Sequence, residues 1–277
     1  MRNRGIELLL TGVPIKTSSY GWEVSYNMAY NKNTVIKIAD GLTSLALPGA
    51  EARTNNGFVY HYEGMPFGQI SGFRELRDAK GDIVYNKDNG QPVQSEFTSL
   101  GGGVPPLTMA LSNKFTYRNF SLSFLIDGKF GAKLYTSTNA YGTYYGLDKR
   151  TVANNVRETG VTLKGVDTDG NPYAATVDAQ EYYQGIAFSI TDQFVSDAGF
   201  IKFRQFILGY SLPDKIVAKT PFQYVSLSLV ARNLFLLYSQ VKNVDPESNY
   251  TNSNAQGLEN FGVPPVRSYG LNLMVRF

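Results

Sequence analysis

The sequence contains no cysteine and only one histidine, His61, among its 277 residues. Without cysteine, the chain can form neither a disulfide framework nor a thiolate metal site. A single histidine excludes metal sites built from several histidines and removes most hydrolytic triads. The composition therefore leaves few ways to build a catalytic or metal-binding centre, and no cofactor is expected.

The sequence also lacks any uninterrupted run of about 18 apolar residues, which a transmembrane helix would need. A transmembrane β-barrel is not excluded, because its strands carry apolar residues only at every second position. Charge of either sign is not in excess: 26 Lys and Arg are interspersed with 23 Asp and Glu, for a net charge of +3. Nucleic-acid binding normally requires a clustered basic face, so the chain is not expected to bind nucleic acid.

Aromatic residues and glycine are abundant by contrast, with 19 Tyr, 17 Phe and 27 Gly. This composition favours strands and turns over helices. Four segments alternate between apolar and polar residues with a period of two, which is typical of strands with two unlike faces. The apolar or aromatic positions of these segments are Trp22, Val24, Tyr26, Met28 and Tyr30; Phe120, Leu122, Phe124, Ile126 and Phe130; Val225, Leu227, Leu229 and Ala231; and Tyr269, Leu271, Leu273, Val275 and Phe277.

The length of these segments separates two all-β interpretations. Strands of soluble sheets usually have about 5 to 6 residues, whereas roughly 9 to 11 residues cross a bilayer at a tilt. The alternating segments are of the longer kind, and their apolar faces begin or end on aromatic residues, as two interfacial girdles would require. The sequence therefore predicts an all-β, antiparallel transmembrane β-barrel segment of about 8 to 10 strands, with the count least certain between Gly57 and Leu107. A long-stranded soluble sandwich or barrel remains the alternative.

The connections between the predicted strands fall into two classes. Some are short, such as Arg118–Asn119, PIKTSSYG and PDKIVAKTPF, whereas the connections over residues 32–65, 132–198 and 237–266 are long and polar. Short turns at one rim and long loops at the other are typical of outer-membrane barrels, whose long loops are extracellular. The second long connection is rich in tyrosine, which would either contact a sugar or a partner, or pack the loop onto itself. These tyrosines are Tyr141, Tyr144, Tyr145, Tyr182 and Tyr183.

Two glycine-containing motifs do not support ligand binding. DTDGNP, residues 167–172, shares Asp167, Asp169 and Gly170 with a calcium loop but lacks the third ligand and the glutamate at position 12. We expect a tight turn there. LGGGVPP, residues 100–106, lacks the Lys and Ser or Thr of a phosphate-binding loop, so we expect a chain reversal into a strand.

Five blocks of the sequence together resemble one protein family. They are RNRGIELLLTGVPIKTSSYGWEVSYNMAYNKNTVIKI, NKFTYRNFSLSFLIDGKFGAKLY, FIKFRQFILGYSLP, VSLSLVARNLFLL followed by VDPES, and PPVRSYGLNLMVRF. In this order, and across nearly the whole chain, they are similar to the C-terminal barrel region of SusC/RagA-type TonB-dependent transporters. The resemblance implies an outer membrane of the Bacteroidota kind, a large barrel with an N-terminal plug, energy from the TonB complex, and a SusD-like surface lipoprotein as partner. Family substrates are oligosaccharides or peptides, so a glycan or peptide would be bound and released without bond chemistry, and no enzymatic activity is expected.

The resemblance also assigns roles to residues. Residues 1–277 would be the C-terminal part of the barrel, with the plug and the N-terminal strands absent. Met1 would then be an internal start or a break in a longer protein. The terminal strand, Tyr269, Leu271, Leu273, Val275 and Phe277, looks like the signal that the outer-membrane assembly machinery recognises, and its apolar face would contact outer-membrane lipid. Polar residues of the opposite face would line the barrel wall and contact the plug or the solute: Glu23, Asn27, Ser121, Asp127, Ser226 and Arg232.

Three other functions remain open. A self-contained small outer-membrane barrel, serving as a porin or a structural protein, would need a strand count that closes. A soluble carbohydrate-binding β-domain would bind sugar without detergent. An enzyme would need a carboxylate pair or a nucleophile, and the spacing of the acidic residues selects none.

Overall fold

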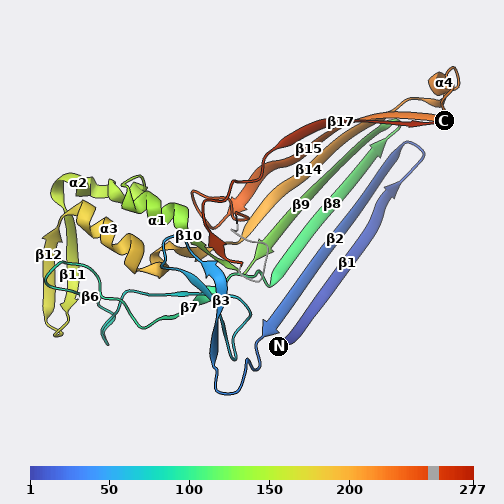
Figure 1. The fold of residues 1–277 in the computed structure, drawn as a ribbon. Helices are drawn as coiled ribbons and strands as arrows, with labels where there is room; N and C mark the ends of the chain where they lie inside the picture. The colour runs from blue at the N-terminus through green and yellow to red at the C-terminus, as the bar shows by residue number, and fades with distance from the viewer. Residues whose placement is uncertain (249–255) are drawn as a thin grey trace.

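The computed structural model describes residues 1–248 and 256–277. Its largest feature is an antiparallel sheet of seven long strands (Figure 1). In spatial order these are β1 (Arg2–Lys16), β2 (Tyr20–Thr34), β8 (Leu107–Tyr117), β9 (Phe120–Phe130), β14 (Phe200–Ser211), β15 (Tyr224–Ser239) and β17 (Ser268–Arg276). Strands β1 and β17 are the two edges of this sheet.

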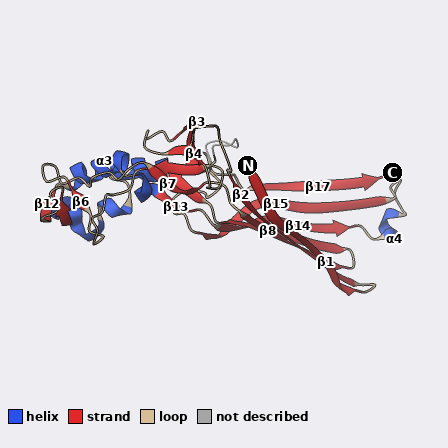
Figure 2. Ribbon diagram, turned by 90° about the horizontal axis from the view of Figure 1, so that it is seen from below, coloured by secondary structure: helices blue, strands red, loops and turns tan. Residues whose placement is uncertain are grey.

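The remaining elements, except one helix, lie in the three long connections, which gather at one end of the sheet (Figures 1 and 2). We call this assembly the loop lobe: the described parts of residues 35–106, 131–199 and 240–267. Its strands form three small sheets: β3 (Ser44–Glu51), β4 (Phe58–Tyr62), β5 (Gln69–Gly72) and β7 (Thr98–Gly102); β13 (Val195–Asp197), β10 (Lys133–Thr136) and β16 (Leu258–Glu259); and β12 (Pro172–Val177), β11 (Val161–Asp167) and β6 (Val84–Tyr85). Its helices are α1 (Ser137–Tyr144), α2 (Val156–Thr159) and α3 (Ala179–Ser189), with the 3-10 turns η1 (Lys149–Thr151), η2 (Ala153–Asn155) and η3 (Thr191–Phe194).

The opposite end of the sheet carries the three shorter connections. Arg118 and Asn119 join β8 to β9, and residues 17–19 join β1 to β2. The third connection, from β14 to β15, contains the short helix α4 (Asp214–Val217). We call the two ends the turn end and the loop end. The predicted antiparallel barrel-segment fold is confirmed, with short and long connections separated as expected.

The number of strands in the large sheet is seven, fewer than the predicted 8 to 10. The difference arises between Gly57 and Leu107, where β4 to β7 have only two to five residues and belong to small sheets of the loop lobe. Glycine and proline recur through this region, as in Gly64, Pro66 and Gly68. Such residues interrupt a strand before it reaches the length of a barrel strand.

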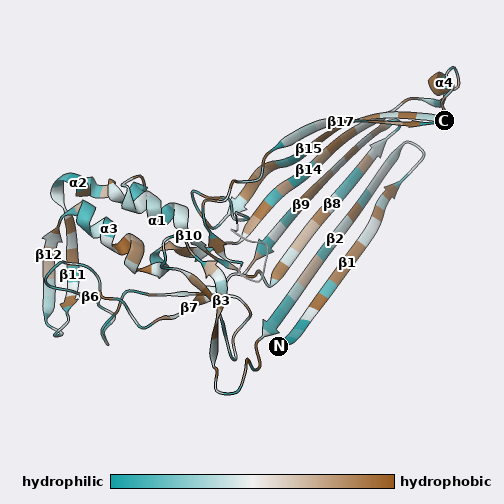
Figure 3. Ribbon diagram, viewed as in Figure 1, coloured by the Kyte–Doolittle hydropathy of each residue, from teal (hydrophilic) through white to brown (hydrophobic). Residues whose placement is uncertain are grey.

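The strand register gives the large sheet one continuous apolar face, visible as alternating bands of hydropathy along the strands (Figure 3). Residues that are paired across neighbouring strands lie on the same face. One such row crosses all seven strands and consists of Ile15, Trp22, Phe115, Leu122, Leu208, Leu229 and Leu271. The adjacent row on the opposite face consists of Lys16, Gly21, Thr116, Ser121, Gly209, Ser228 and Asn272.

Aromatic rings mark both ends of the apolar face. At the turn end, the rings of Tyr20 and Tyr117 lie 4.7 Å apart, as do those of Phe120 and Tyr210. At the loop end, Tyr30 closes the apolar face of β2 and Phe130 that of β9. The eleven residues from Phe120 to Phe130 span about 34 Å along the strand. A strand tilt of roughly 40° reduces this length to about 26 Å, close to the ~25 Å apolar band of outer-membrane barrels.

The loop lobe has a hydrophobic core of its own. Val59, Ile70, Tyr135 and Phe194 are almost fully buried there. The hydroxyl groups of Tyr135 and Thr54 lie 2.7 Å apart, so the buried phenol keeps a hydrogen bond. The long connections are thus folded rather than merely long and polar. None of the helices in the described residues is long and apolar enough to cross a membrane.

Candidate functional site

The six residues predicted to line the barrel wall all lie on the polar face of the large sheet. Glu23 and Asn27 lie on β2, Ser121 and Asp127 on β9, and Ser226 and Arg232 on β15. They are distributed along the face rather than gathered into one site. Their role in lining a lumen stays a prediction.

Only Asp127 of these residues belongs to a charged cluster, which is organised by Arg204 of β14. A β-bulge between Phe203 and Gln205 interrupts the pairing of β14 with both of its neighbours. The Arg204 guanidinium donates from Nε and Nη2 to the two carboxylate oxygens of Asp127, at 3.0 and 2.8 Å. It also donates to both oxygens of Glu247, at 2.9 and 3.1 Å. Such paired contacts hold a carboxylate in a fixed orientation.

Lys202 is the second centre of this cluster and is buried. Its ammonium donates to Asp245 at 2.7 and 2.9 Å and to Glu247 at 2.8 Å. The Lys129 ammonium lies 3.5 Å from Glu247 and completes three cations against three carboxylates. We call these six residues the rim network, because they lie near the loop end of β9 and β14 and bind the segment that follows β15.

The rim network holds Glu247 ionised. Burial by itself raises the pKa of this carboxyl group, but the hydrogen bonds from Arg204 and Lys202 outweigh burial and lower the pKa to about 2. The charges balance within the network, so it is suited to anchoring the 245–248 segment to the wall rather than to catalysis. The sequence contained a signal for it, since Lys202 and Arg204 are charged residues within an apolar strand.

Two of the five predicted loop-contact tyrosines pack into the loop lobe. Tyr141 lies edge-on to the rings of Phe188 and Phe261, with centroids 5.1 and 5.2 Å away. Tyr182 packs edge-on against Tyr183, and burial raises the pKa of its hydroxyl. Both side chains thus pack within the loop lobe, and their role in contacting a sugar or a partner stays a prediction.

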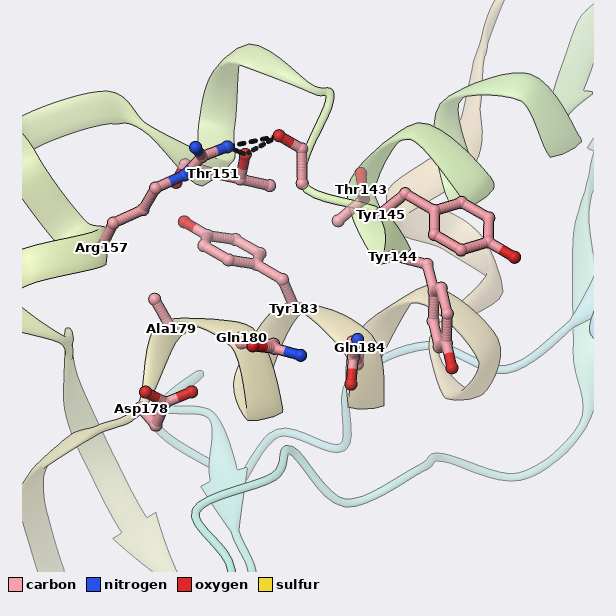
Figure 4. A pocket seen from close by; sticks show the side chains of 11 residues that line it. Thr143, Tyr144, Tyr145, Thr151, Arg157, Asp178, Ala179, Gln180, Tyr183 and Gln184 are labelled. Carbon is pink, nitrogen blue, oxygen red and sulfur yellow. Dashed lines mark hydrogen bonds between the residues drawn. The ribbon is translucent and has the colours of Figure 1, made fainter.

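The other three tyrosines line a cavity of 670 Å³ between α1 and α3 (Figure 4). Tyr183 extends from α3 and its hydroxyl donates to the carbonyl of Arg150 at 2.8 Å, whereas Tyr144 and Tyr145 lie at the end of α1. Lining residues other than the tyrosines are Thr143, Gly146, Thr151, Arg157, Asp178, Ala179, Gln180 and Gln184. Sequence reasoning missed these residues, because the helices that bring them together were not predicted.

The DTDGNP motif forms the tight turn that the sequence predicts. The Asp167 carboxylate accepts hydrogen bonds from the backbone N–H groups of Asp169 and Asn171, at 2.9 and 2.8 Å, and closes the β11–β12 hairpin. These backbone hydrogen bonds lower the pKa of Asp167. His61 packs against the ring of Phe67 and accepts a hydrogen bond from the N–H of Gly68 at 3.2 Å. Across the described ranges, no three or more His, Asp or Glu side chains are grouped so that they could hold a metal ion.

The predicted assembly-signal residues lie on the edge strand. Tyr269, Leu271, Leu273 and Val275 share the apolar face of the sheet with the residues opposite them on β15. Phe277 follows the end of β17, and its ring packs edge-on against Phe222 at 5.3 Å while staying 79% exposed. Its role as an assembly signal stays a prediction.

Comparison with known proteins shows that the chain is similar in sequence to TonB-dependent receptors. No protein-family model matches it. It is 25% identical, over an alignment of 302 residues, to TonB-dependent receptor P3 of Formosa agariphila, covering 100% of this chain and 29% of that receptor. It is 24% identical, over 299 aligned residues, to TonB-dependent receptor SusC of Bacteroides thetaiotaomicron, with 100% of this chain and 26% of SusC covered.

The fold has solved counterparts. The structure of the RagAB peptide transporter matches with a TM-score of 0.67 at 18% identity, covering 99% of this chain and 29% of that chain. The RagAB peptide importer in its open-open state matches with a TM-score of 0.68 at 19% identity, covering 99% and 28%. The chain spans less than a third of the length of each of these relatives. Sequence similarity over the whole chain and the shared fold therefore confirm that this protein resembles part of a SusC/RagA-type TonB-dependent receptor.

Proposed function

We propose that this chain is the C-terminal part of the barrel of a TonB-dependent outer-membrane transporter that imports oligosaccharides or peptides. The observation that carries the proposal is the continuous, exposed apolar face of a seven-stranded sheet that ends in aromatic rings on both sides. Such a face is stable against lipid and not against water. The similarity to the TonB-dependent receptors P3 and SusC and to the RagAB transporter structures also supports the proposal.

Strand direction argues against the alternative of a self-contained small barrel. In an antiparallel sheet of seven strands the two edge strands, β1 and β17, run in the same direction. Figure 1 agrees, since the N-terminus lies at the loop end and the C-terminus at the turn end. Closing the sheet on itself would pair β1 with β17 in parallel. An antiparallel closure needs an odd number of further strands.

A larger barrel satisfies this requirement. Large plugged transporters have about 22 strands, which leaves fifteen, an odd number, beyond the seven of this sheet. The edges also need partners on energetic grounds, because unpaired backbone groups in hydrocarbon cost several kcal/mol each. Both arguments support a wall segment that is completed by other strands.

The two faces would then have different partners. The apolar face would contact outer-membrane lipid, and the polar face, with Glu23, Asn27, Ser121, Asp127, Ser226 and Arg232, would line the lumen. By analogy with the named relatives, the loop lobe would meet a SusD-like lipoprotein at the cell surface, and the plug would receive energy from the TonB complex. Transport would consist of binding and energised release of a glycan or peptide.

Phe277 is proposed to serve assembly rather than transport. Deleting Phe277 should reduce the amount of folded protein in the outer membrane, whereas Phe277→Tyr, which keeps a terminal aromatic ring, should not. Normal insertion of the deletion variant would contradict this role.

The whole proposal is tested by a blot of native outer-membrane fractions with an antibody against residues 132–198. A band far heavier than the 30.6 kDa of this chain is expected, together with substrate uptake that is lost when tonB is deleted. A heat-modifiable band at 30.6 kDa would instead indicate a self-contained small barrel, and the TonB-driven mechanism would be withdrawn.

A further inference from the structure

The cavity between α1 and α3 has the features of a ligand site separate from the polar face of the large sheet. Its volume of 670 Å³ is within the range of small-ligand sites, about 300–1,000 Å³. It lies among the helices of the loop lobe, beyond the loop end of the sheet (Figures 1 and 4).

Unused amide groups line one side of this cavity. Gln180 and Gln184 lie one helical turn apart on α3, and therefore on the same face of that helix. Neither side-chain amide forms a hydrogen bond with any residue that the structure describes. Each amide offers two N–H donors and a carbonyl acceptor. Together they can bind neighbouring hydroxyl groups of one ligand, both donating and accepting.

Aromatic rings line the side formed by α1. The rings of Tyr144 and Tyr145 are perpendicular, at 86° and with centroids 5.0 Å apart. Phe188 covers one face of Tyr144. The Tyr141 ring is stacked beside Tyr145 at 6.1 Å, but Tyr145 is still 66% exposed. An exposed tyrosine ring beside hydrogen-bonding groups suits a ligand that has both an apolar C–H face and a hydroxylated edge.

The charged residues of the cavity favour a neutral ligand. Its lining has one cation, Arg157, and one carboxylate, Asp178. Both already form hydrogen bonds within the protein. Arg157 donates to the carbonyl of Thr151 at 3.1 Å and to the carbonyl of Gly146, so it holds the cavity wall. Asp178 accepts from the N–H of Glu181 at 3.0 Å and caps α3. The remaining polar groups of the lining are uncharged.

The secondary-structure elements that supply the lining also indicate which class of ligand fits the cavity. Those residues belong to α1, α2, α3, η1 and the turns beside them, and not to a strand. A peptide bound by strand addition needs an exposed strand edge, which this lining does not offer. A pyranose ring matches the three features at once, because it has C–H groups for stacking, adjacent hydroxyls for the amides, and no charge.

We infer that this cavity binds a neutral pyranose unit of an oligosaccharide, between the Tyr145 ring and the amides of Gln180 and Gln184. The inference rests on the proposed function, and it deepens that function by naming the substrate class and a surface site for it. A site in the loop lobe would hold one part of an oligosaccharide outside the lumen.

The test is calorimetric binding to the intact receptor, purified from outer membranes in detergent. The probes are neutral hexasaccharides: α-1,4-, β-1,4- and β-1,3-linked glucose and β-1,4-linked mannose, with a tryptic digest of casein as the peptide probe. We expect at least one hexasaccharide to bind. The Gln180→Ala/Gln184→Ala variant should bind it about tenfold more weakly, as the loss of two hydrogen bonds predicts.

Matched variants separate stacking from general damage. Tyr145→Ala should also weaken binding, and Tyr145→Phe, which keeps the ring, should bind nearly as well as the wild type. Leu147→Ala serves as the control, because Leu147 lies two residues away, is 82% exposed and does not line the cavity. Its affinity should be unchanged.

Three results would overturn the inference: no binding of any of the four hexasaccharides, unchanged affinity in the Gln180→Ala/Gln184→Ala variant, or peptides that bind and are lost in that variant. Measuring TonB-dependent substrate uptake distinguishes failure of the cavity site from failure of the proposed transport function. If uptake remains TonB-dependent while the glutamine variant binds normally, the cavity site is wrong and the transporter stands. A heat-modifiable 30.6 kDa barrel would reject the transporter itself.

Discussion

Individual residues of β14 show how a barrel strand accommodates buried charge. Phe203 and Phe206 both lie on the apolar face, opposite Ile126 and Phe124, although they are an odd number of residues apart. The bulge between Phe203 and Gln205 makes this possible, because one extra residue changes the phase of the alternation. The bulged Arg204 is directed at Asp127 and Glu247 instead. Alternation in the sequence predicts the strand but not a change of phase within it.

Lys202 provides the first prediction at this scale. Lys202→Ala removes the cation from Asp245 and Glu247, whose side chains are only 16% and 21% exposed. Glu247 keeps Arg204 and Lys129, but Asp245 loses its cation. A carboxylate left unpaired in such surroundings typically costs about 3–5 kcal/mol. We therefore expect faster hydrogen exchange in the 240–248 segment of the variant. Lys133→Ala is the matched control, since its partner Asp197 is 56% exposed and such surface pairs contribute roughly 0–1 kcal/mol. Equal protection of the 240–248 segment in both variants would contradict the anchoring role.

Glu247 provides a prediction about pH. Its pKa in the folded protein, about 2, is below its ordinary value of 4.5. The open state therefore binds more protons between these two values, and the stability that Glu247 contributes is full above pH 4.5 and lost as the pH falls towards 2. Hydrogen exchange of the 240–248 segment should thus show constant protection from pH 7 to about 5 and decreasing protection below 4.5. Glu247→Gln should lack this decrease, and a decrease of the same size in both proteins would assign it to another group.

Whole elements differ in how far the sequence predicts them. Strands β2, β9, β15 and β17 are predictable because their signal is local: each alternates over about eight residues or more. Helix α1, with the sequence STNAYGTY, carries almost no local helical signal and has no side-chain cap from its N-cap residue. Glu259, which is distant in the sequence, accepts a hydrogen bond from the backbone N–H of Thr138 at 3.0 Å. Because such support comes from another connection, no short window of the sequence could predict this helix, nor the cavity that it lines.

Strand β17 allows a prediction that tests the two faces of the sheet within one element. Leu271 lies on the apolar face, paired with Leu229, and its neighbour Asn272 lies on the polar face, paired with Ser228. A lysine on the lipid face of a barrel costs roughly 2–4 kcal/mol near the bilayer midplane, and lumen substitutions are tolerated far better. Leu271→Lys should therefore reduce the folded, heat-modifiable receptor in outer membranes, and Asn272→Lys should not. If the two variants inserted equally well, the assignment of the faces would be wrong.

At the scale of the whole molecule, the open question is what covers the edges β1 and β17. The absence of cysteine from this chain helps to answer the question, because cysteines introduced here have no competitors within these 277 residues. In the intact receptor, Leu271→Cys would be combined in turn with Ile6→Cys, Leu8→Cys and Leu10→Cys on the apolar face of β1. If the sheet closed on itself, one of these pairs would be close enough for a disulfide, which requires Cα atoms within about 7 Å. We expect none to form, since a closed antiparallel barrel needs further strands between these edges.

The positive control is Leu227→Cys with Leu273→Cys, which are paired across β15 and β17 and should cross-link readily. A disulfide from β1 to β17 within one chain would show that seven strands close by themselves, and the larger barrel would then have to be abandoned.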